Sequence, residues 1–465
     1  MHNGGPHGHH VDLLERSSEE AAGEVLGWTE RTGPAYLLVV LVLAAVAALG
    51  VVGFAMKAAD GGLDSHHPWG YLAAALAFIM TTSLSAPLVA IAPRFGKAHW
   101  NRYVSRIAET WSVVGLLSIL IMVPLLLTLP SAEHRQTLLM YNKVAEGWPV
   151  GAPHLYVALV LVFTAINGFG LLWASAIPDF ALAKSRVGGL RGALYSKLAL
   201  GWVGTKRQWR ALRAGLGVLG ALYFIFIVWS HTTISFDFGQ SLVPGLRDSV
   251  FPAWQALGGI QAALATVIVT SFVVRMFGGF KEYIGVNQFW SMAKLMLASS
   301  LLWMYFWWSG FIIYWYAKTP QAQDFLQLMW FGPYRTIFII TIICNFALVL
   351  GILMWNPVRK SILGPTIVSC LIIFGAFLDK IRIYVGFYSV EEYTGHILQE
   401  VPEAVPPGLG DGLMVAGVIG GALLLYTLAI KFVPIFNLWE IREGSMLQVI
   451  RPFKRLPLKI LAKPE

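Results

Sequence analysis

The segment AGLGVLGALYFIFIVWSHTTISFDFGQSLVPG, residues 214–245, joins a long apolar run to a polar end. The run from 214 to 231 is close to the length that an α-helix needs to cross the hydrocarbon core of a bilayer. His231 closes this run, and Asp237 follows between two phenylalanines. Two interpretations are open. Polar residues are common where a helix reaches the lipid headgroups, but these two side chains could also belong to a functional site.

The composition of the chain indicates a membrane protein. Of its 465 residues, 57% are hydrophobic and 13% are charged, whereas about a quarter of an ordinary soluble domain is charged. Mean hydropathy is +0.64. Many of the 18 Trp and 16 Tyr residues lie near the ends of apolar runs, as expected at membrane–water interfaces. The first apolar run begins only near Pro34, so we expect no cleavable signal peptide.

The pattern of apolar runs predicts an all-α, polytopic membrane protein. A spanning helix needs about 20 mostly apolar residues, and ten segments meet that requirement. They are residues 34–56, 69–92, 108–129, 154–177, 214–231, 252–276, 290–316, 335–355, 362–386 and 412–435.

The distribution of basic residues predicts the orientation. If both termini are cytoplasmic, 25 of the 34 Lys and Arg residues lie in the inner connections and 6 in the outer ones. This asymmetry follows the positive-inside rule and predicts that both termini are cytoplasmic. It also accounts for the net charge of +9 through contact with anionic inner-leaflet lipids, so we expect no nucleic-acid partner.

A few ionisable residues fall within or at the ends of the apolar segments. Because an ionised group in a bilayer costs several kcal/mol unless it is paired or faces a polar cavity, each is a functional candidate. The alternative is local pairing, of Arg106 with Glu109 and of Asp379 with Arg382, or a long side chain that reaches the interface. The candidates are Glu109, Asp179, Lys294, Asp379 and Arg382.

The sequence argues against a redox cofactor held by this chain alone. A haem-binding membrane cytochrome needs histidine ligands in the middle of its helices, and none of the eleven histidines occupies such a place. The two cysteines, Cys344 and Cys370, are too few for an iron–sulfur cluster. The segment MHNGGPHGHH, residues 1–10, is expected to be a flexible terminus rather than a metal site.

Five motifs, taken in order, resemble a known family. They are HPWGYLAAALAF (67–78), WNRYVSRIAE (100–109), HTTISFDFGQSLVPG (231–245), SGFIIYWYAKTP (309–320) and FGAFLDKIRIYVG (374–386). Over residues 65–435 the chain resembles the NrfD-like superfamily of polysulfide reductase membrane subunits. Within it, the chain is most similar to the integral subunits of bacterial alternative complex III, ActF and ActC. The R-x-A-E and S-x-F-x-x-x-W patterns resemble ActF, whereas VPG after SFDF resembles ActC.

This resemblance implies a particular domain organisation. Two four-helix bundles are expected, with the first and last helices peripheral to them. The implied parts are a cytoplasmic segment (1–33), a peripheral helix and outer loop (34–68), the first bundle (69–231), an outer loop (232–251), the second bundle (252–386), another outer loop (387–411), a peripheral helix (412–435) and a basic cytoplasmic tail (436–465).

The resemblance also implies a function, which is oxidation of a quinol of the menaquinol type at the outer face. Electrons would pass to an iron–sulfur subunit and c-type haem subunits, beside a paralogous ten-helix subunit. The chain itself would hold neither haem nor cluster. The implied quinol site consists of His231, Asp237, His67 and Trp69, and the implied proton path of Glu109, Asp179 and Asp379 with Lys294 and Arg382. Two alternatives remain open: a structural anchor without its own quinol site and a proton-coupled secondary transporter.

Overall fold

The computed structural model describes residues 17–130, 152–246, 248–393, 397–453 and 456–461. The histidine-rich segment 1–10 lies outside the described residues. The α-helices are α1 (Ser18–Glu30), α2 (Pro34–Gly61), α3 (Gly70–Ile79), α4 (Leu88–Phe95), α5 (Ser105–Thr110), α6 (Gly115–Thr128), α7 (Ala152–Ala183), α8 (Gly189–Leu198), α9 (Lys206–Asp237), α10 (Val250–Phe277), α11 (Val286–Ala317), α12 (Pro320–Leu326), α13 (Arg335–Ile342), α14 (Leu348–Leu353), α15 (Asn356–Arg359), α16 (Leu363–Lys380), α17 (Gly386–Tyr388), α18 (Leu409–Ala429) and α19 (Leu438–Met446).

Shorter helical turns join these helices. The 3₁₀ turns are η1 (His67–Trp69), η3 (Trp100–Tyr103), η4 (Trp111–Val114) and η5 (Gln240–Leu242), and the π-helical turns are η2 (Met80–Leu84), η6 (Gln327–Phe331), η7 (Ile343–Ala347) and η8 (Ile381–Val385). At the C-terminal side, β1 (Gln448–Phe453) and β2 (Leu456–Leu461) pair as an antiparallel hairpin. The prediction of a helical fold is therefore confirmed for the apolar part of the chain, and the hairpin is an addition that it did not include.

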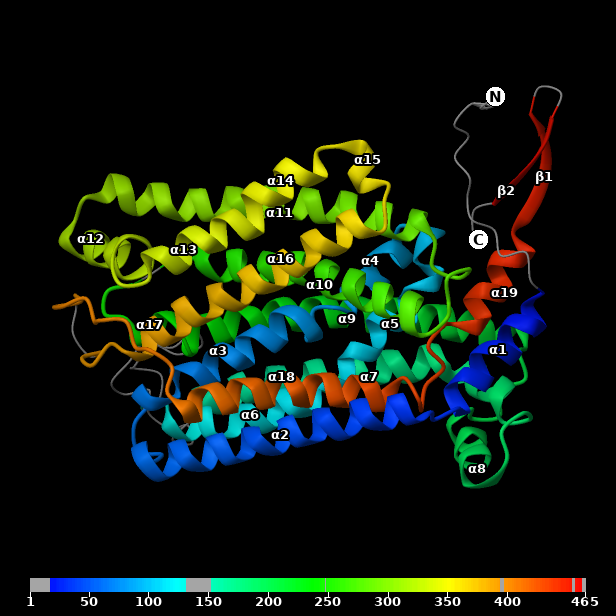
Figure 1. The fold of residues 1–465 in the computed structure, drawn as a ribbon, viewed down its shortest axis with the longest axis horizontal. Coiled ribbons are helices and arrows are strands. Elements are labelled where there is room, and N and C mark those ends of the chain that lie inside the picture. Colours follow the sequence, from blue (N-terminus) through cyan, green and yellow to red (C-terminus); the bar gives the residue numbers. More distant parts are fainter. Residues whose placement is uncertain (1–16, 131–151, 247, 394–396, 454–455, 462–465) are drawn as a thin grey trace.

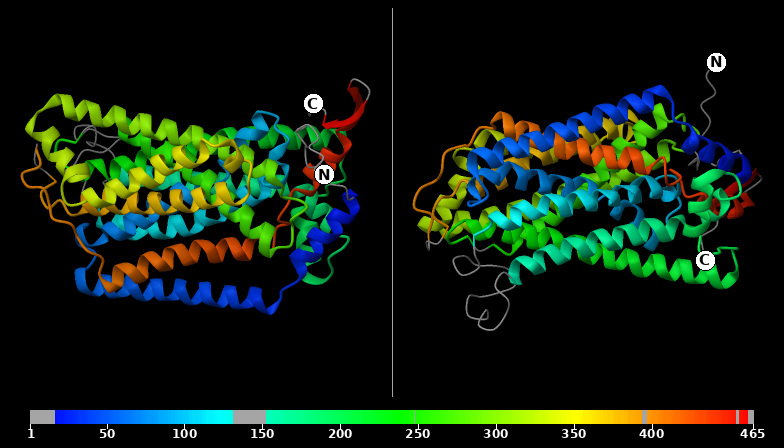
Figure 2. Two further views of the ribbon diagram at one scale, coloured as in Figure 1. Left: turned by 45° about the horizontal axis from the view of Figure 1, so that its top comes forward. Right: turned by 90° about the horizontal axis from the view of Figure 1, so that it is seen from below.

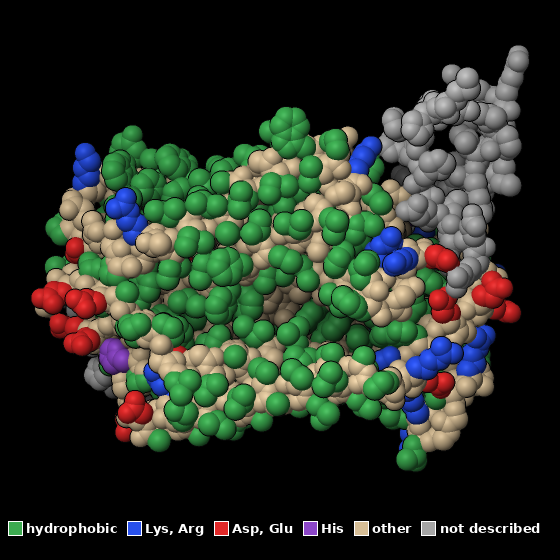
Figure 3. All heavy atoms as spheres, viewed as in Figure 1, with side chains coloured by type: hydrophobic (Ala, Val, Ile, Leu, Met, Phe, Trp, Pro, Cys, Tyr) green, Lys and Arg blue, Asp and Glu red, His purple; other side chains and the backbone are tan. Residues whose placement is uncertain are grey.

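The long helices lie side by side along the longest axis of the molecule, and their connections gather at its two ends (Figure 1). One end carries α1, α8 and α19 and is called the α8 end below. The opposite end carries α12 and α17 and is called the α12 end. Hydrophobic side chains cover the flank between the two ends, whereas Lys, Arg, Asp and Glu gather toward the ends (Figure 3). Such a belt is the surface that a lipid bilayer requires.

Nine helices among the described residues are long and apolar enough to cross a membrane. They correspond to nine of the ten predicted segments and identify a multi-pass helical membrane protein. The segment predicted at 362–386 is helical as well, through α16, η8 and α17, but is not among the nine.

The helix that contains the SFDF motif continues past its predicted end at His231. It runs to Asp237, so the connection that follows it is shorter than the predicted loop. Hydroxyl groups in the added turns donate to backbone carbonyls one turn earlier, Thr232 to Val228 at 2.9 Å and Ser235 to His231 at 2.6 Å. These polar residues satisfy their hydrogen bonds within the helix and can therefore remain in it.

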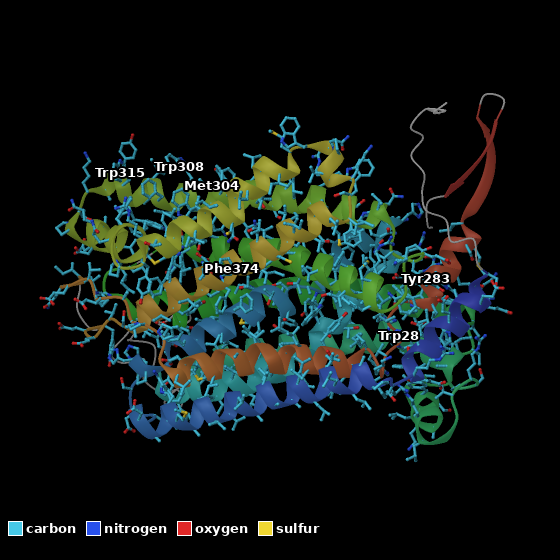
Figure 4. All side chains as sticks on the ribbon, in the orientation of Figure 1. Trp28, Tyr283, Met304, Trp308, Trp315 and Phe374 are labelled. Atoms are coloured by element: carbon cyan, nitrogen blue, oxygen red, sulfur yellow. The ribbon has the colours of Figure 1, made fainter. Side chains whose placement is uncertain are left out.

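Aromatic side chains mark both ends of the apolar belt (Figure 4). Trp308 and Trp315 of α11 lie toward the α12 end and are about half exposed. Trp28 of α1 lies at the α8 end, where its ring meets Phe280 at 5.5 Å. Nearby, the Tyr283 hydroxyl donates to Glu24 at 2.8 Å. These contacts attach α1 to the loop between α10 and α11.

The first and last of the nine helices, α2 and α18, lie beside each other at one side of the molecule (Figure 2). Glycines bring their backbones together. A Cβ atom added to Gly417 would lie 2.2 Å from the Gly50 Cα atom, and one added to Gly50 would lie 2.5 Å from the Gly417 Cα atom. Close backbone approach through small residues is a principal means of helix association in a bilayer.

Replacing Gly417 by Val should weaken the α2–α18 contact, because no space exists for a branched side chain against Gly50. We expect the free energy of unfolding in mixed detergent micelles to fall by about 1–3 kcal/mol. The control is Gly412→Val on the same helix, where an added Cβ meets nothing within 4 Å. An equal loss of stability in both variants would show that this close contact is not what holds the helices together.

Candidate functional site

A buried charged cluster lies at the α8 end, and we call it the inner charge cluster. It consists of Arg94, Arg106, Glu109, Asp179 and Glu440, from α4, α5, α7 and α19. Except for Arg94, whose side chain is 17% exposed, each of these residues is almost fully buried. Two guanidinium groups thus face three carboxyl groups away from bulk water.

Each guanidinium in the inner charge cluster bridges two helices. Arg94 contacts Glu109 and lies 2.8 Å from the carboxylate of Glu440. Arg106 lies 2.8 Å from Asp179 and 3.6 Å from Glu109. The local Arg106–Glu109 pair predicted from the sequence therefore exists, but it is longer than the pair that each of these residues makes with another helix.

Neutral groups also form hydrogen bonds with the charged side chains of the cluster. Asn437 accepts a hydrogen bond from Arg106, and the Ser175 hydroxyl donates to Glu109 at 2.6 Å. The backbone N–H of Trp439 donates to Asp179 at 3.3 Å. Burial raises the pKa of the Glu440 carboxyl, against the lowering effect of Arg94. With three carboxyl groups and two guanidiniums, the cluster is one positive charge short and is suited to hold one exchangeable proton.

A second polar site lies between the helices toward the α12 end, and we call it the His231 cavity. Its side chains come from α3 and η2, from α9, from α10, and from α16 and η8. The lining residues are Ala77, Met80, Thr81, His231, Ile234, Gln255, Lys380 and Tyr384. Its volume of about 10 Å³ is close to the space that one water molecule needs.

The hydrogen bonds of His231 define its chemistry. Its Nδ1 lies 2.8 Å from the carbonyl oxygen of Ile227 and therefore carries the proton that it donates. Its Nε2 is buried and has no hydrogen-bond partner among the described residues. In the neutral ring this nitrogen holds a lone pair, so His231 can accept a proton there.

The other polar groups of the cavity are held in place. The Lys380 ammonium donates to the amide oxygen of Gln255, and both residues are buried. Gly259 leaves the space that the imidazole occupies: an added Cβ would lie 2.9 Å from His231 Nε2 and 2.9 Å from Ser85 Oγ. The cavity is thus lined by a cation and by an imidazole that can accept a proton.

Asp379 and Arg382 form the local pair predicted from their spacing. The guanidinium donates to the Asp379 carboxylate at 2.7 and 3.1 Å, and both side chains are buried. Arg382 also donates to the Met329 carbonyl of η6 at 2.8 Å. Its charge lies 5.3 Å from the ring centre of Phe338 and 5.7 Å from that of Trp254. The Asp379 carboxylate therefore pairs with an arginine one turn later in the chain.

The HPW segment lies at the α12 end, apart from the lining of the His231 cavity. His67 Nδ1 donates to the carbonyl oxygen of Tyr388 at 2.9 Å, and its ring packs against that of His66 with centres 4.0 Å apart. Trp69 is fully buried and donates from Nε1 to the Gly62 carbonyl at 3.2 Å. This segment thus packs against α17.

Two further predicted residues lie outside these groupings. Asp237 is buried at the end of α9, where its backbone carbonyl accepts from the Ser241 hydroxyl at 2.8 Å. Lys294 is exposed on α11, and its ammonium lies 4.2 Å from the ring centre of Trp290. The structure therefore separates Lys294 from the inner charge cluster and gives it an interfacial contact.

Sequence reasoning missed Arg94, Gln255 and Glu440. Arg94 lies just beyond the predicted segment 69–92 and Glu440 lies in the predicted tail 436–465, where the sequence alone gives no reason to expect burial. The structure places them in α4 and α19. Gln255 had a detectable signal, because it is an amide within the apolar segment 252–276. Lys380 was visible as a charge beside Asp379, but nothing in the local sequence indicates that it lines one cavity with His231.

Replacing Arg106 by Met should cost about 3–5 kcal/mol of stability, because Asp179 would be left buried without its cation. Unfolding in mixed micelles, followed by tryptophan fluorescence, measures the loss. The matched control is Arg213→Met, which removes a pair with Glu443 whose arginine side chain is 52% exposed and should cost about 1 kcal/mol or less. Equal effects in the two variants would mean that the inner charge cluster does not stabilise the fold.

The comparisons with known proteins identify no relative: no family model matches the chain, and no curated protein matches it.

Proposed function

We propose that this chain is an integral membrane subunit of a quinol-oxidising complex of the alternative complex III type, within the NrfD-like superfamily. Its role is to bind a menaquinol-type quinol and accept protons from it. Electrons leave to an iron–sulfur subunit and c-type haem subunits, and a paralogous ten-helix subunit lies beside it. The observation that carries this proposal is the buried imidazole of His231, which lines an internal cavity together with Lys380 and whose Nε2 has no hydrogen-bond partner among the described residues.

The chemistry of quinol oxidation fits that arrangement. A quinol that becomes a quinone releases two electrons and two protons, so the site needs proton acceptors near the hydroxyl groups. His231 offers a lone pair at Nε2, because Nδ1 donates to Ile227.

The size of the His231 cavity limits where the quinol ring binds. A volume of about 10 Å³ accepts a water molecule and not an aromatic ring. The proposal therefore puts the ring at the α12 end, near Asp237 and the His67–Trp69 turn, and has protons reach His231 through water. The excess of Lys and Arg in the predicted inner connections supports an orientation with the α12 end outside and both termini in the cytoplasm. The proposed membrane is the bacterial cytoplasmic membrane, as the family resemblance implies.

The inner charge cluster suggests how protons cross the membrane. Glu109 and Asp179 are two of its three buried carboxyl groups at the α8 end. Between it and His231 lie buried hydroxyl groups, among them Thr81 and Ser85 of the second span. Trp111, two residues after Glu109 in the chain, donates to Thr270 Oγ1 at 3.2 Å. Proton transfer along these groups and bound water would couple the two ends.

The arrangement of helices supports the family assignment in its finer form. We take α16, with η8 and α17, as the tenth spanning helix, since it packs against α10 and α13. The helices from α3 to α9 then form one four-helix bundle and those from α10 to α17 the second. The peripheral pair is α2 and α18, which lie side by side (Figure 2).

Two other functions have specific support. A structural anchor fits the Asp379–Arg382 pair, which satisfies its charges internally and needs no ligand. A proton-coupled transporter fits the π-helical interruptions η2 and η8 beside a buried cavity. Co-purification with c-type haem and iron–sulfur subunits argues against the transporter, and bound quinone argues against the pure anchor.

Replacing His231 by Gln should slow quinol oxidation by the purified complex about 100-fold or more, because the proton acceptor is lost. The assay follows reduction of the c-type haems by a menaquinol analogue. The control is His99→Gln, at the α8 end, where Arg102 Nη1 lies 2.8 Å from the ring nitrogen Nδ1. A native rate in an intact His231→Gln complex would remove His231 from the reaction and favour the anchor.

Replacing Glu109 by Gln should lower the number of protons released per electron in proteoliposomes, since the inner charge cluster would lose a titratable group. Glu443→Gln is the control at the same end, because Glu443 is partly exposed and pairs with Arg102 and Arg213. Unchanged proton yield in Glu109→Gln, with normal electron transfer, would exclude Glu109 from the proton path.

A further inference from the structure

A large pocket opens at the α8 end, separate from the His231 cavity. It has a volume of about 950 Å³ and lies between α1, the end of α7, the start of α9 and α19. Asp179 forms part of its wall, so the pocket reaches the inner charge cluster. Figure 1 shows α1, α8 and α19 gathered at this end.

Basic side chains dominate the ionisable lining of this pocket. Its acidic residues are Glu19, Asp179 and Glu443, of which Asp179 pairs with Arg106, and Glu443 with Arg102 and Arg213. Four lining cations have no carboxylate within ion-pair distance in the described part of the chain. They are Arg186, Lys206, Arg210 and Arg442.

Tryptophans and a helix terminus add to this charge. Trp202, Trp209 and Trp439 line the pocket, with Trp202 and Trp209 edge to face at 5.0 Å. The 32-residue helix α9 begins at Lys206 and so directs the positive end of its dipole toward the same space. The pocket thus combines positive charge with indole rings, which favour the membrane–water interface.

The depth of the pocket matches the headgroup layer. One membrane-spanning segment ends at Ala183 and another begins at Lys206, and the lining residues come from just beyond and just inside these points. Apolar side chains on the wall include Leu182, Val203 and Met446. A ligand here would meet cations on one side and an apolar surface on the other.

We propose that this pocket binds the phosphate headgroup of an anionic phospholipid. The guanidinium groups of Arg186, Arg210 and Arg442 suit the oxygens of a phosphate, because a guanidinium donates two parallel hydrogen bonds. The tryptophans cover the glycerol region, and the apolar wall accepts the start of an acyl chain. This proposal does not depend on the quinol chemistry.

The test measures lipid-dependent stability of the full chain in detergent. Short-chain phosphatidylglycerol should raise the melting temperature of the native protein, and short-chain phosphatidylcholine should not. The triple variant Arg186→Gln, Arg210→Gln, Arg442→Gln should lose the phosphatidylglycerol effect while it keeps its lipid-free melting temperature. The control triple variant Lys184→Gln, Arg207→Gln, Lys281→Gln removes the same charge from exposed residues outside the pocket and should keep the effect.

Three outcomes would overturn the proposal. Loss of the effect in both triple variants would show general attraction to basic residues. An equal rise in melting temperature with inorganic phosphate at the same concentration would show a free-anion site instead of a lipid site. If the triple variant does not fold, Arg210→Gln alone should still weaken phosphatidylglycerol binding several-fold, and native binding by this variant would refute the proposal.

Discussion

The guanidinium of Arg106 connects parts of the chain that are far apart in the sequence. It contacts Glu109 on its own helix, Asp179 on α7 and Asn437 at the start of α19, and it is fully buried. A charge in this position is tolerated only if its partners stay in place, because isolated burial costs several kcal/mol. The geometry of α5, α7 and α19 is therefore tied together at one point. The wall of the large pocket at the α8 end depends on the same contacts. Asp179, which pairs with Arg106, and Trp439, whose backbone N–H donates to Asp179, both line that pocket.

The His231 cavity depends on a different constraint, which is the loss of regular helical geometry on two sides. The turns η2 and η8 are π-helical, and Thr81 and Tyr384 reach the cavity from them. Single π-helical turns inside α-helices are frequent at functional sites. Gly259 leaves room for the His231 imidazole, because an added Cβ would lie 2.9 Å from its Nε2. The polar groups thus have space for water inside an otherwise closely packed core.

Much of the fold could be predicted from the sequence. The length of each apolar segment predicts a spanning helix, and the distribution of Lys and Arg predicts the orientation of the helices in the bilayer. The Asp379–Arg382 pair was also predictable, since both residues lie one turn apart on one helix. Contacts between helices were not predictable in this way. Nothing in the local sequence indicates that Arg94 meets Glu440, or that Lys380 reaches Gln255, because each pair joins distant segments.

The same limit explains why the extent of α9 was underestimated. Thr232, Thr233 and Ser235 look like the start of a polar loop, yet their hydroxyl groups bond to the helix itself. Hydropathy measures the residue and not its hydrogen bonds, so it ended the helix too early. Asp237 consequently lies at the last turn of a helix and is buried, where a loop position was expected.

The glycine contact between α2 and α18 has a consequence for biosynthesis. Its two members are the first and last of the nine long apolar helices, so the earlier one leaves the ribosome long before its partner exists. Until then α2 must remain in lipid, with the glycine face of Gly50 and Gly53 uncovered. Insertion of α18 is the step that completes the assembly. A chain truncated before this helix would leave Gly50 and Gly53 facing lipid, without the close backbone contacts that α18 provides.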